Sequence, residues 1–181
     1  MIESEAARLE RLVGDLLLLA RLGSTDFPLH PAVVDPASTV ASVVEGLGQD
    51  ADDRGLHLGA RLADAPYAIE VDPDRLAQIV ANLVSNALRF AATEVTVSLH
   101  ETDGWVHLAV GDDGPGIDDV DLPHVFERLY MASATPAVKE SGGGLGLAIV
   151  RDLTERMGGV VEARRSRRGG AEFVVSFRSA R

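Results

Sequence analysis

Residues 72–90 read DPDRLAQIVANLVSNALRF, and this stretch decides the fold. An Asp-Pro pair is a common helix start, and the apolar residues after it recur every three or four positions. This periodicity predicts an amphipathic helix that buries one stripe of side chains: Leu76, Ile79, Val80, Leu83, Val84 and Ala87. The helix also carries Asn82 and Asn86, which lie four residues apart and therefore share one face, one turn apart.

Two strands follow this helix. Apolar and polar residues alternate over 95–100 and again over 105–110, and Asp103-Gly104 between them is typical of a hairpin turn. A glycine-rich stretch then leads into a predicted helix over 145–157. The chain ends in a second hairpin, with strands over 160–164 and 173–177 and a basic turn between them. These elements predict an α/β (α+β) fold: a two-layer sandwich of a mixed sheet with helices on one face.

The residues before 72 predict three more elements and a linker. Residues 2–22 carry apolar positions with the spacing 4-3-4-3-4, which is typical of a helix that packs against other helices. We call these positions the seam: Ile2, Ala6, Leu9, Val13, Leu16 and Ala20. Gly23-Ser24 ends this helix, and 27–35 is interpreted as a linker or edge strand. A helix over 37–54 and a strand over 56–62 complete the pattern. We therefore expect a heptad helix at 1–22, a linker at 23–35 and one domain at 36–181.

Composition narrows the class of protein. With 181 residues, 46% of them hydrophobic, the chain can form one domain with its own core. The formal charge of −11 argues against nucleic-acid binding, and the absence of cysteine excludes disulfides and thiolate metal sites. We find no apolar run long enough to span a bilayer and no export signal at the start. We expect a cytoplasmic location and leave open whether a parent protein or complex is membrane-associated.

Four short segments carry residue types suited to a magnesium nucleotide. They are NLVSN at 82–86, DDGPG at 112–116, FERLY at 126–130 and GGGLGL at 142–147. An amide oxygen is a hard ligand that suits Mg²⁺, and a carboxylate such as Asp112 can accept a hydrogen bond from the amine of adenine. Guanine would present a carbonyl there, which favours ATP over GTP. Each segment alone also has an ordinary interpretation: solvated asparagines, an acidic turn or a glycine linker.

Taken in this order, the four segments resemble the N, G1, F and G2 boxes of the ATP-binding catalytic domain of sensor histidine kinases, which has the Bergerat (GHKL) fold. The resemblance covers nearly the whole chain and implies ATP and Mg²⁺ as cofactors. It implies that Asn86 is the magnesium ligand, supported by Asn82, and that Asn82, Asn86 and Arg128 are the catalytic residues. The implied nucleotide contacts are Asn82, Asn86, Arg89, Phe90, Asp112, Gly114, Gly116, Ile117, Lys139, Gly142, Gly143, Gly144, Leu145, Gly146 and Leu147.

The chain departs from the family pattern at two places. Met131 stands where the family commonly has an arginine that reaches the terminal phosphate, and Arg128 or Lys139 are the candidates to replace it. Gly143 stands where serine or threonine is frequent.

In the ATP-hydrolysing relatives of gyrase type, a water-activating glutamate lies one helical turn before the magnesium asparagine. Asn82 occupies that place here and cannot abstract a proton, so we expect slow hydrolysis.

None of the five histidines lies in the His-Glu/Asp-Leu-Arg-Thr-Pro context of a phosphate acceptor. The resemblance therefore implies a kinase that passes the γ-phosphoryl group of ATP to a histidine on another segment or on a partner protein, and indirectly to a response regulator. Residues 5–22 resemble the second helix of the dimerisation and histidine-phosphotransfer hairpin, so helical-bundle association through residues 2–22 is one expectation. The other is that this helix folds back on its own domain.

Several alternatives stay open at this point. The chain is either an excised part of a longer kinase or one half of a natural split kinase. Its function is histidine kinase catalysis, non-catalytic nucleotide sensing as an interaction module, or ATP hydrolysis of the GHKL type.

Overall fold

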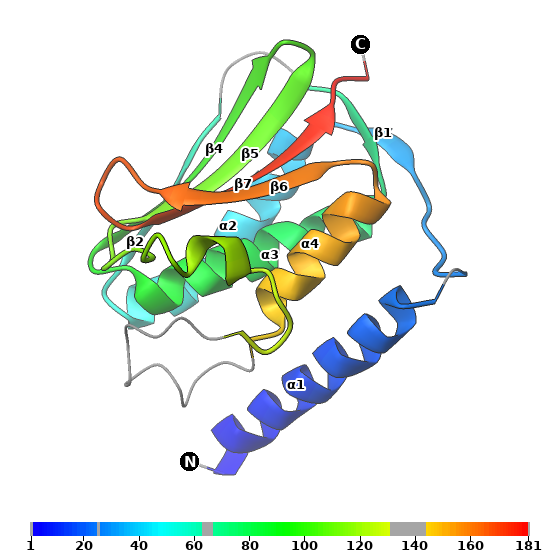
Figure 1. Ribbon diagram of the computed structural model, residues 1–181. Coiled ribbons are helices and arrows are strands. Elements are labelled where there is room, and N and C mark those ends of the chain that lie inside the picture. Colours follow the sequence, from blue (N-terminus) through cyan, green and yellow to red (C-terminus); the bar gives the residue numbers. More distant parts are fainter. Residues whose placement is uncertain (1, 25, 63–66, 131–143, 181) are drawn as a thin grey trace.

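The computed structural model describes residues 2–24, 26–62, 67–130 and 144–180, and within the first helix the side chains of 2–8 and 11 are left out (Figure 1). Four α-helices, seven strands and one 3-10 turn are assigned in these ranges. In chain order they are α1 Ile2–Leu22, β1 Ala32–Val34, α2 Pro36–Asp53, β2 His57–Arg61, β3 Ile69–Val71, α3 Pro73–Phe90, β4 Glu94–Thr102, β5 Trp105–Asp112, η1 Leu122–His124, α4 Gly146–Arg156, β6 Val160–Arg165 and β7 Ala171–Arg178.

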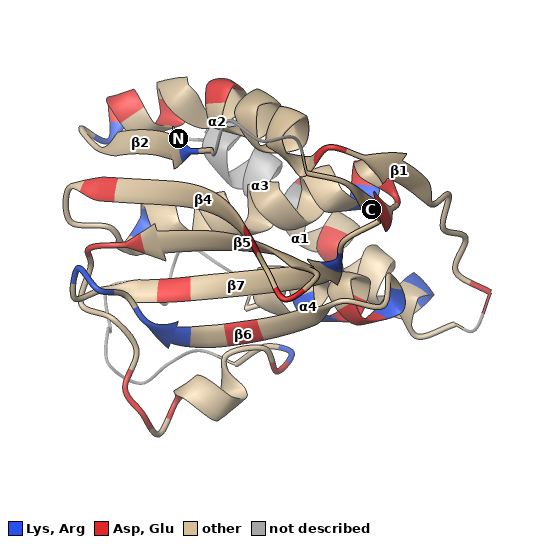
Figure 2. Cartoon of the chain, turned by 90° about the horizontal axis from the view of Figure 1, so that it is seen from above, with Lys and Arg blue, Asp and Glu red and all other residues tan. Residues whose placement is uncertain are grey.

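Five strands form the main sheet in the order β2-β4-β5-β7-β6 (Figure 2). β2 is parallel to β4, and the remaining neighbours are antiparallel, so the sheet is mixed. Figure 1 shows α2, α3 and α4 together on one face of this sheet. The predicted two-layer sandwich is therefore confirmed.

The core lies between the sheet and the helices, and α3 is central to it. Every residue of its predicted stripe is fully buried. Asp72 caps the start of α3, because its Oδ1 accepts the N–H groups of Asp74 and Arg75 at 3.1 and 3.2 Å. Its Oδ2 accepts the N–H of His30 at 2.9 Å. Burial by itself would raise the pKa of Asp72, but these N–H donors outweigh it and hold the pKa below its usual value.

A small second sheet was not predicted in full. β3 pairs with β1 in an antiparallel register, with Val33 opposite Glu70. Residues 27–35 were interpreted as a linker or an edge strand, and Ala32–Val34 within them form a strand. β3 has only three residues, too few for alternation to distinguish it from a loop. This sheet lies at the N-terminal end of α3, and the residues discussed below lie at the C-terminal end.

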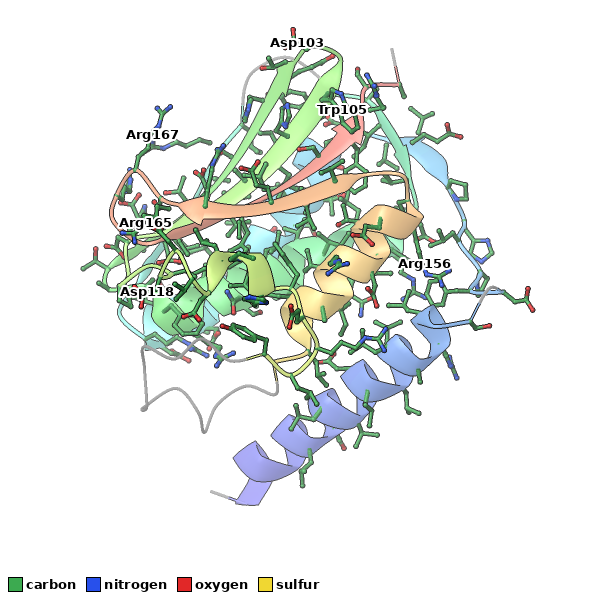
Figure 3. The ribbon with its side chains drawn as sticks, in the orientation of Figure 1. Asp103, Trp105, Asp118, Arg156, Arg165 and Arg167 are labelled. Carbon is green, nitrogen blue, oxygen red and sulfur yellow. The ribbon has the colours of Figure 1, made fainter. Side chains whose placement is uncertain are left out.

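Helix α1 contacts α4 near its own C-terminal end. Leu19 and Leu22 are buried there. Arg156 of α4 donates to the carbonyl oxygens of Leu22 and Ser24, the latter at 2.8 Å, and so caps the helix end (Figure 3). The guanidinium of Arg156 also lies over the ring of Phe27, 5.7 Å from its centre.

The seam of α1 points away from the domain where its side chains are described. Leu9, Val13 and Leu16 are 58%, 55% and 60% exposed, respectively. The expectation that this helix folds back holds for its end, through Leu19 and Leu22. The seam is left uncovered, and its association in a helical bundle stays a prediction. Among the described helices, none has the length and apolar character needed to cross a membrane.

Candidate functional site

The C-terminal half of α3 faces the start of α4. Asn82 lies so close to Gly146 that its Cγ would be 4.0 Å from a Cβ placed on that glycine. The Nδ2 atom of Asn82 is buried and has no hydrogen-bond partner among the described residues. A buried amide that donates to nothing costs free energy, roughly 1–3 kcal/mol, and so calls for an explanation. A ligand oxygen between α3 and α4 would satisfy it.

Asn86 lies one turn further along α3 and is half-buried. Arg89 and Phe90 end the helix, and the guanidinium of Arg89 lies over the Phe90 ring, 5.2 Å from its centre. The helix therefore carries an amide, a cation and an aromatic ring in succession toward its C-terminal end, the residue types that the family resemblance assigns to the nucleotide.

Asp112 ends strand β5 with only 2% of its surface exposed. Its Oδ1 accepts the N–H groups of Gly114 at 2.8 Å and Ala171 at 3.3 Å. Its Oδ2 accepts no hydrogen bond from the described residues, which leaves one carboxylate oxygen for a ligand. Burial raises the pKa of Asp112; the two N–H donors oppose this rise, and the neighbouring Asp113 adds to it.

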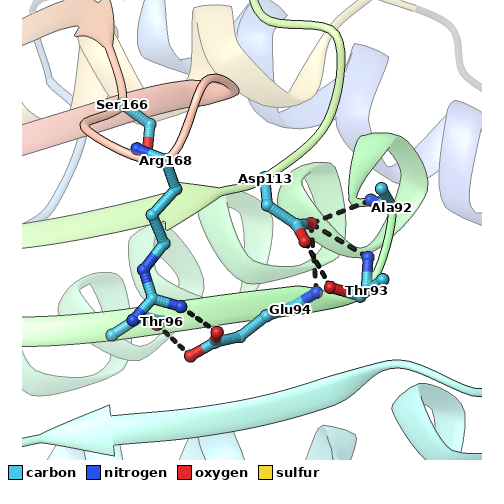
Figure 4. Close-up of polar contacts among 7 residues, drawn as sticks. All are labelled: Ala92, Thr93, Glu94, Thr96, Asp113, Ser166 and Arg168. Atoms are coloured by element: carbon cyan, nitrogen blue, oxygen red, sulfur yellow. Dashed lines mark hydrogen bonds and ion pairs between the residues drawn. The ribbon is translucent and has the colours of Figure 1, made fainter.

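Asp113 holds the chain that follows α3 (Figure 4). Its Oδ1 accepts the N–H groups of Ala92, Thr93 and Glu94 at 2.9, 2.9 and 3.0 Å. Its Oδ2 accepts the hydroxyl of Thr93. Burial alone would raise the pKa of Asp113, but these hydrogen bonds, led by the Thr93 hydroxyl, lower it. Adjacent carboxylates thus have opposite pKa shifts because one is buried and the other is richly hydrogen-bonded.

Two positions after Asp112 require glycine, because other backbone segments approach them closely. A Cβ on Gly114 would collide with the carbonyl oxygen of Phe90. Gly116 has a positive φ of 79°, and a Cβ there would lie 2.9 Å from the carbonyl oxygen of Gly169. The loop after β5 is therefore pressed between the end of α3 and the β6–β7 turn. Ile117 follows and packs half-buried against the core.

The β6–β7 turn, residues 166–170, is a part of the site that the sequence did not assign. A Cβ on Gly170 would collide with the Asp112 carboxylate. The turn is closed by hydrogen bonds from Ser166 N–H to Gly170 O at 2.8 Å and from Gly169 N–H to Ser166 O at 3.1 Å. Arg167 and Arg168 lie in the turn, and Arg165, directly before it, pairs with Asp119 at 3.2 Å. The basic composition of the turn was visible in the sequence, but its contact with Asp112 depends on backbone groups that no pattern reveals.

The FERLY segment is tied to the start of α4. Phe126 packs edge-on against Phe173 with ring centres 6.0 Å apart. The N–H of Leu129 donates to the carbonyl oxygen of Gly144 at 3.0 Å. Gly144 has a positive φ of 63°, and a Cβ there would lie 2.9 Å from the carbonyl oxygen of Tyr130. Tyr130 donates its hydroxyl to Asp121, and this hydrogen bond raises the pKa of Tyr130.

Arg128 is engaged elsewhere in this conformation. Its guanidinium donates to Asp152 on α4 at 3.0 Å. A role at the terminal phosphate, which was one of the two sequence expectations for replacing the missing arginine, would require this ion pair to open. Lys139, Gly142, Gly143 and Met131 lie outside the described residues.

Helix α4 begins at Gly146, directly after Gly144 and Leu145. Leu145 is buried, and Leu147 packs half-buried against the core, so these two leucines anchor the glycines around them. The first N–H groups of a helix lack intrahelical partners and carry the positive end of its dipole, so they suit an anion. The Asn82 amide lies beside this helix start. The structure thus brings together segments 82–90, 112–117 and 144–147.

Comparisons with known proteins agree with this assembly. Residues 71–181 match the family described as histidine kinase-, DNA gyrase B-, and HSP90-like ATPase. The signal transduction histidine-protein kinase AfsQ2 of Streptomyces coelicolor is 37% identical over 97% of this chain and 31% of its own length. Histidine protein kinase DivJ of Caulobacter vibrioides is 35% identical over 98% of this chain and 30% of its own. The chain spans about a third of the length of these curated relatives.

A solved structure extends the comparison. Full-length ShkA, crystallised with AMPPNP, superposes with a TM-score of 0.83 at 33% identity and covers 97% of this chain and 37% of ShkA. Acinetobacter baumannii AdeS superposes with a TM-score of 0.79 at 21% identity over 98% of this chain and 82% of its own, which supports the fold.

Proposed function

This chain belongs to the histidine kinase-, DNA gyrase B- and HSP90-like ATPase family, and from this premise we propose that it binds Mg·ATP and donates the γ-phosphoryl group to a histidine. The family membership confirms the resemblance that the four segments predicted. We propose phosphoryl transfer to a histidine as the reaction of this chain.

One observation carries the proposal. Polar atoms on separate segments lack partners among the described residues: the buried Nδ2 of Asn82, and the Oδ2 of Asp112, whose other oxygen already accepts two N–H groups. One is a donor beside the start of α4, where a phosphate oxygen would accept. The other is an acceptor at the end of β5, where the amine of adenine would donate. An adenine nucleotide supplies both missing partners, with acceptors at one end and a donor at the other.

The residues also fit a magnesium ion. We assign Asn86 as its ligand, because a half-buried amide oxygen near the phosphates suits an ion that keeps several of its waters. When bound, Mg²⁺ would neutralise part of the negative charge of the phosphates. Arg89 would add a cation at the same end, and Phe90 would border the nucleotide. Gly114, Gly116, Ile117, Gly144, Leu145, Gly146 and Leu147 would line its path. The resemblance also assigns Lys139, Gly142 and Gly143 to the nucleotide, and these three lie outside the described residues.

The acceptor histidine and the partner are further parts of the proposal. We infer that the exposed seam of α1 packs in a helical bundle, since Leu9, Val13 and Leu16 leave a continuous apolar stripe uncovered. The partner would be a histidine-containing phosphotransfer domain or protein, and a response regulator would receive the group afterwards. Burying one such leucine stabilises a bundle by about 1.5–3 kcal/mol.

A non-catalytic nucleotide-sensing module is the second candidate, and the ion pair between Arg128 and Asp152 favours it. Without Arg128, the described residues near α4 offer fewer cations for the terminal phosphate. ATP hydrolysis of the GHKL type is less well supported, because Asn82 cannot act as a general base.

Incubation with γ-labelled ATP, Mg²⁺ and a histidine-containing hairpin separates these candidates. If the chain is a kinase, it labels the hairpin histidine, and the Asn86→Ala variant does not. The control variant Gln49→Ala, which removes an exposed amide on α2, should still label the histidine. Nucleotide binding without label on any hairpin would instead support the sensing module. Rapid release of labelled phosphate by the chain alone would support the ATPase.

A further inference from the structure

The carboxylate of Asp113 holds four donors, yet it belongs to neither end of the proposed nucleotide. Three backbone N–H groups and the Thr93 hydroxyl converge on it (Figure 4). Such charge-assisted hydrogen bonds are about twice as strong as neutral ones. The side chain itself is only half-buried. So many donors on one partly exposed carboxylate call for an explanation beyond the turn that it closes.

The four donors lie on a segment that directly continues α3. Ala92, Thr93 and Glu94 come two to four residues after Phe90, and Asp113 comes one residue after Asp112. The carboxylate therefore joins the helix that carries Asn86 to the strand end that carries Asp112. The missing Cβ of Gly114 lets the Phe90 carbonyl approach the same loop.

A second set of contacts joins the same two segments from the other side. The Glu94 carboxylate pairs with Arg168. The N–H of Arg168 donates to Ser166 Oγ at 3.2 Å, within the turn whose Gly170 packs on Asp112. The next residue, Ala171, donates its N–H to Asp112 Oδ1. Asp113, Glu94, the 166–170 turn and Asp112 thus form a closed chain of contacts.

We propose that Asp113 is a positioning residue that fixes the distance between two halves of the nucleotide site. The base-binding half is at Asp112, and the phosphate-binding half is at Asn82, Asn86 and the start of α4. The inference rests on the proposed function. Mg·ATP must contact both halves at once, so its affinity depends on how well their separation is set in advance. Adenosine contacts only the base-binding half, where Asp112 keeps its own donors from Gly114 and Ala171.

The test compares the two ligands on three chains. We expect Asp113→Ala to weaken Mg·ATP binding by about tenfold and to change adenosine binding by less than about twofold, because only the spanning ligand loses preorganisation. Asp113→Asn retains an oxygen for the three N–H groups, and its amide can donate to Thr93. It should therefore bind Mg·ATP within about threefold of the unaltered chain. Titration calorimetry measures Mg·ATP, and NMR line shifts measure the weaker adenosine.

Asp35→Ala is the matched control. Asp35 caps α2 by accepting one N–H, that of Ala37 at 3.0 Å. It follows β1, at the N-terminal end of α3, and α3 with its 18 residues is about 27 Å long. Losing this cap should lower the melting temperature without changing either affinity. A purely structural role for Asp113 would give the same pattern as this control.

The possible outcomes discriminate clearly. Selective loss of Mg·ATP binding with rescue by asparagine supports the positioning role. A folded Asp113→Ala chain that binds Mg·ATP normally, or that weakens for both ligands equally, overturns it. If that variant does not fold, Arg168→Ala opens the closed chain at an exposed ion pair instead: a selective loss of about two- to threefold supports the role, and no loss overturns it. Failure of the unaltered chain to bind Mg·ATP would refute the proposed function, a result distinct from both.

Discussion

Asp112→Asn should make the protein more stable while weakening its binding of ATP. The side chain is almost completely buried, and its Oδ1 already accepts the N–H groups of Gly114 and Ala171. Asparagine retains that oxygen and replaces Oδ2, which is not fully buried, with an amide nitrogen of nearly the same size that can donate to water when no nucleotide is bound. The substitution therefore changes the charge and the free acceptor and leaves the shape of the site in place.

The expected gain in stability follows from the pKa of Asp112. Burial raises this pKa above its unfolded value, so the folded state favours the neutral form and the carboxylate charge destabilises it at pH 7. Removing the charge should increase the free energy of unfolding by about 1 kcal/mol, or roughly 2–4 °C in melting temperature for a chain of this size. The difference between the two proteins should shrink as the pH falls toward 4, since the carboxyl then becomes protonated.

The expected loss of affinity follows from the free Oδ2. A hydrogen bond to a charged acceptor contributes about 1.5–3 kcal/mol, so ATP should bind roughly 10- to 150-fold more weakly to the variant. Thermal unfolding and titration calorimetry on the same samples measure both effects. Asp103→Asn is the control, since Asp103 is exposed at the tip of the β4–β5 hairpin, with a φ of 54° that asparagine tolerates (Figure 3). A destabilised variant, or one that binds ATP normally, would refute the reasoning.

Three further predictions concern other parts of the fold. Gly170→Ala should weaken ATP binding at least about tenfold and cost about 1–3 kcal/mol of stability, because its Cβ would displace Asp112. Gly14→Ala is the control, since a Cβ on Gly14 meets no atom within 4 Å, and it should change neither property. A normal affinity for Gly170→Ala would show that the turn does not set the position of Asp112. Asp72 has a lowered pKa, so its stabilisation is present above pH 3.8 and is lost as the pH falls further. The acid unfolding curves of the protein and of Asp72→Asn should therefore converge as the pH falls below 3.8, and curves that stay apart would exclude this cap as the cause. Arg156→Ala should raise hydrogen exchange at the end of α1, measured by mass spectrometry, without changing ATP affinity; unchanged exchange would mean that the leucines alone hold the helix.

The sequence predicted the elements that have a strong period. Helices α1 to α4 and the strands of both long hairpins lie within one or two residues of their expected ranges. The buried stripe of α3 was predicted residue by residue, because a single burial direction imposes its 3.6-residue period on the side chains. β3 was missed since three residues carry too little pattern.

The site was predicted less evenly than the fold. The contributions of Asn82, Asn86 and Asp112 come from side chains at fixed spacing, which a sequence displays. The contribution of Gly170 comes from the absence of a Cβ beside a residue 58 positions away, and that depends on the pairing of β5 with β7. The sequence also could not show where the Arg128 side chain points, because its ion pair with Asp152 joins two segments that are separate in the chain.

Titration calorimetry of the chain with ATP and with GTP, each with Mg²⁺ and with EDTA, tests the central claim most directly. The account predicts one site that binds ATP, prefers it to GTP by at least about tenfold through Asp112, and weakens when the metal is removed. An absence of binding heat with Mg·ATP, or equal affinity for the two nucleotides, would contradict it.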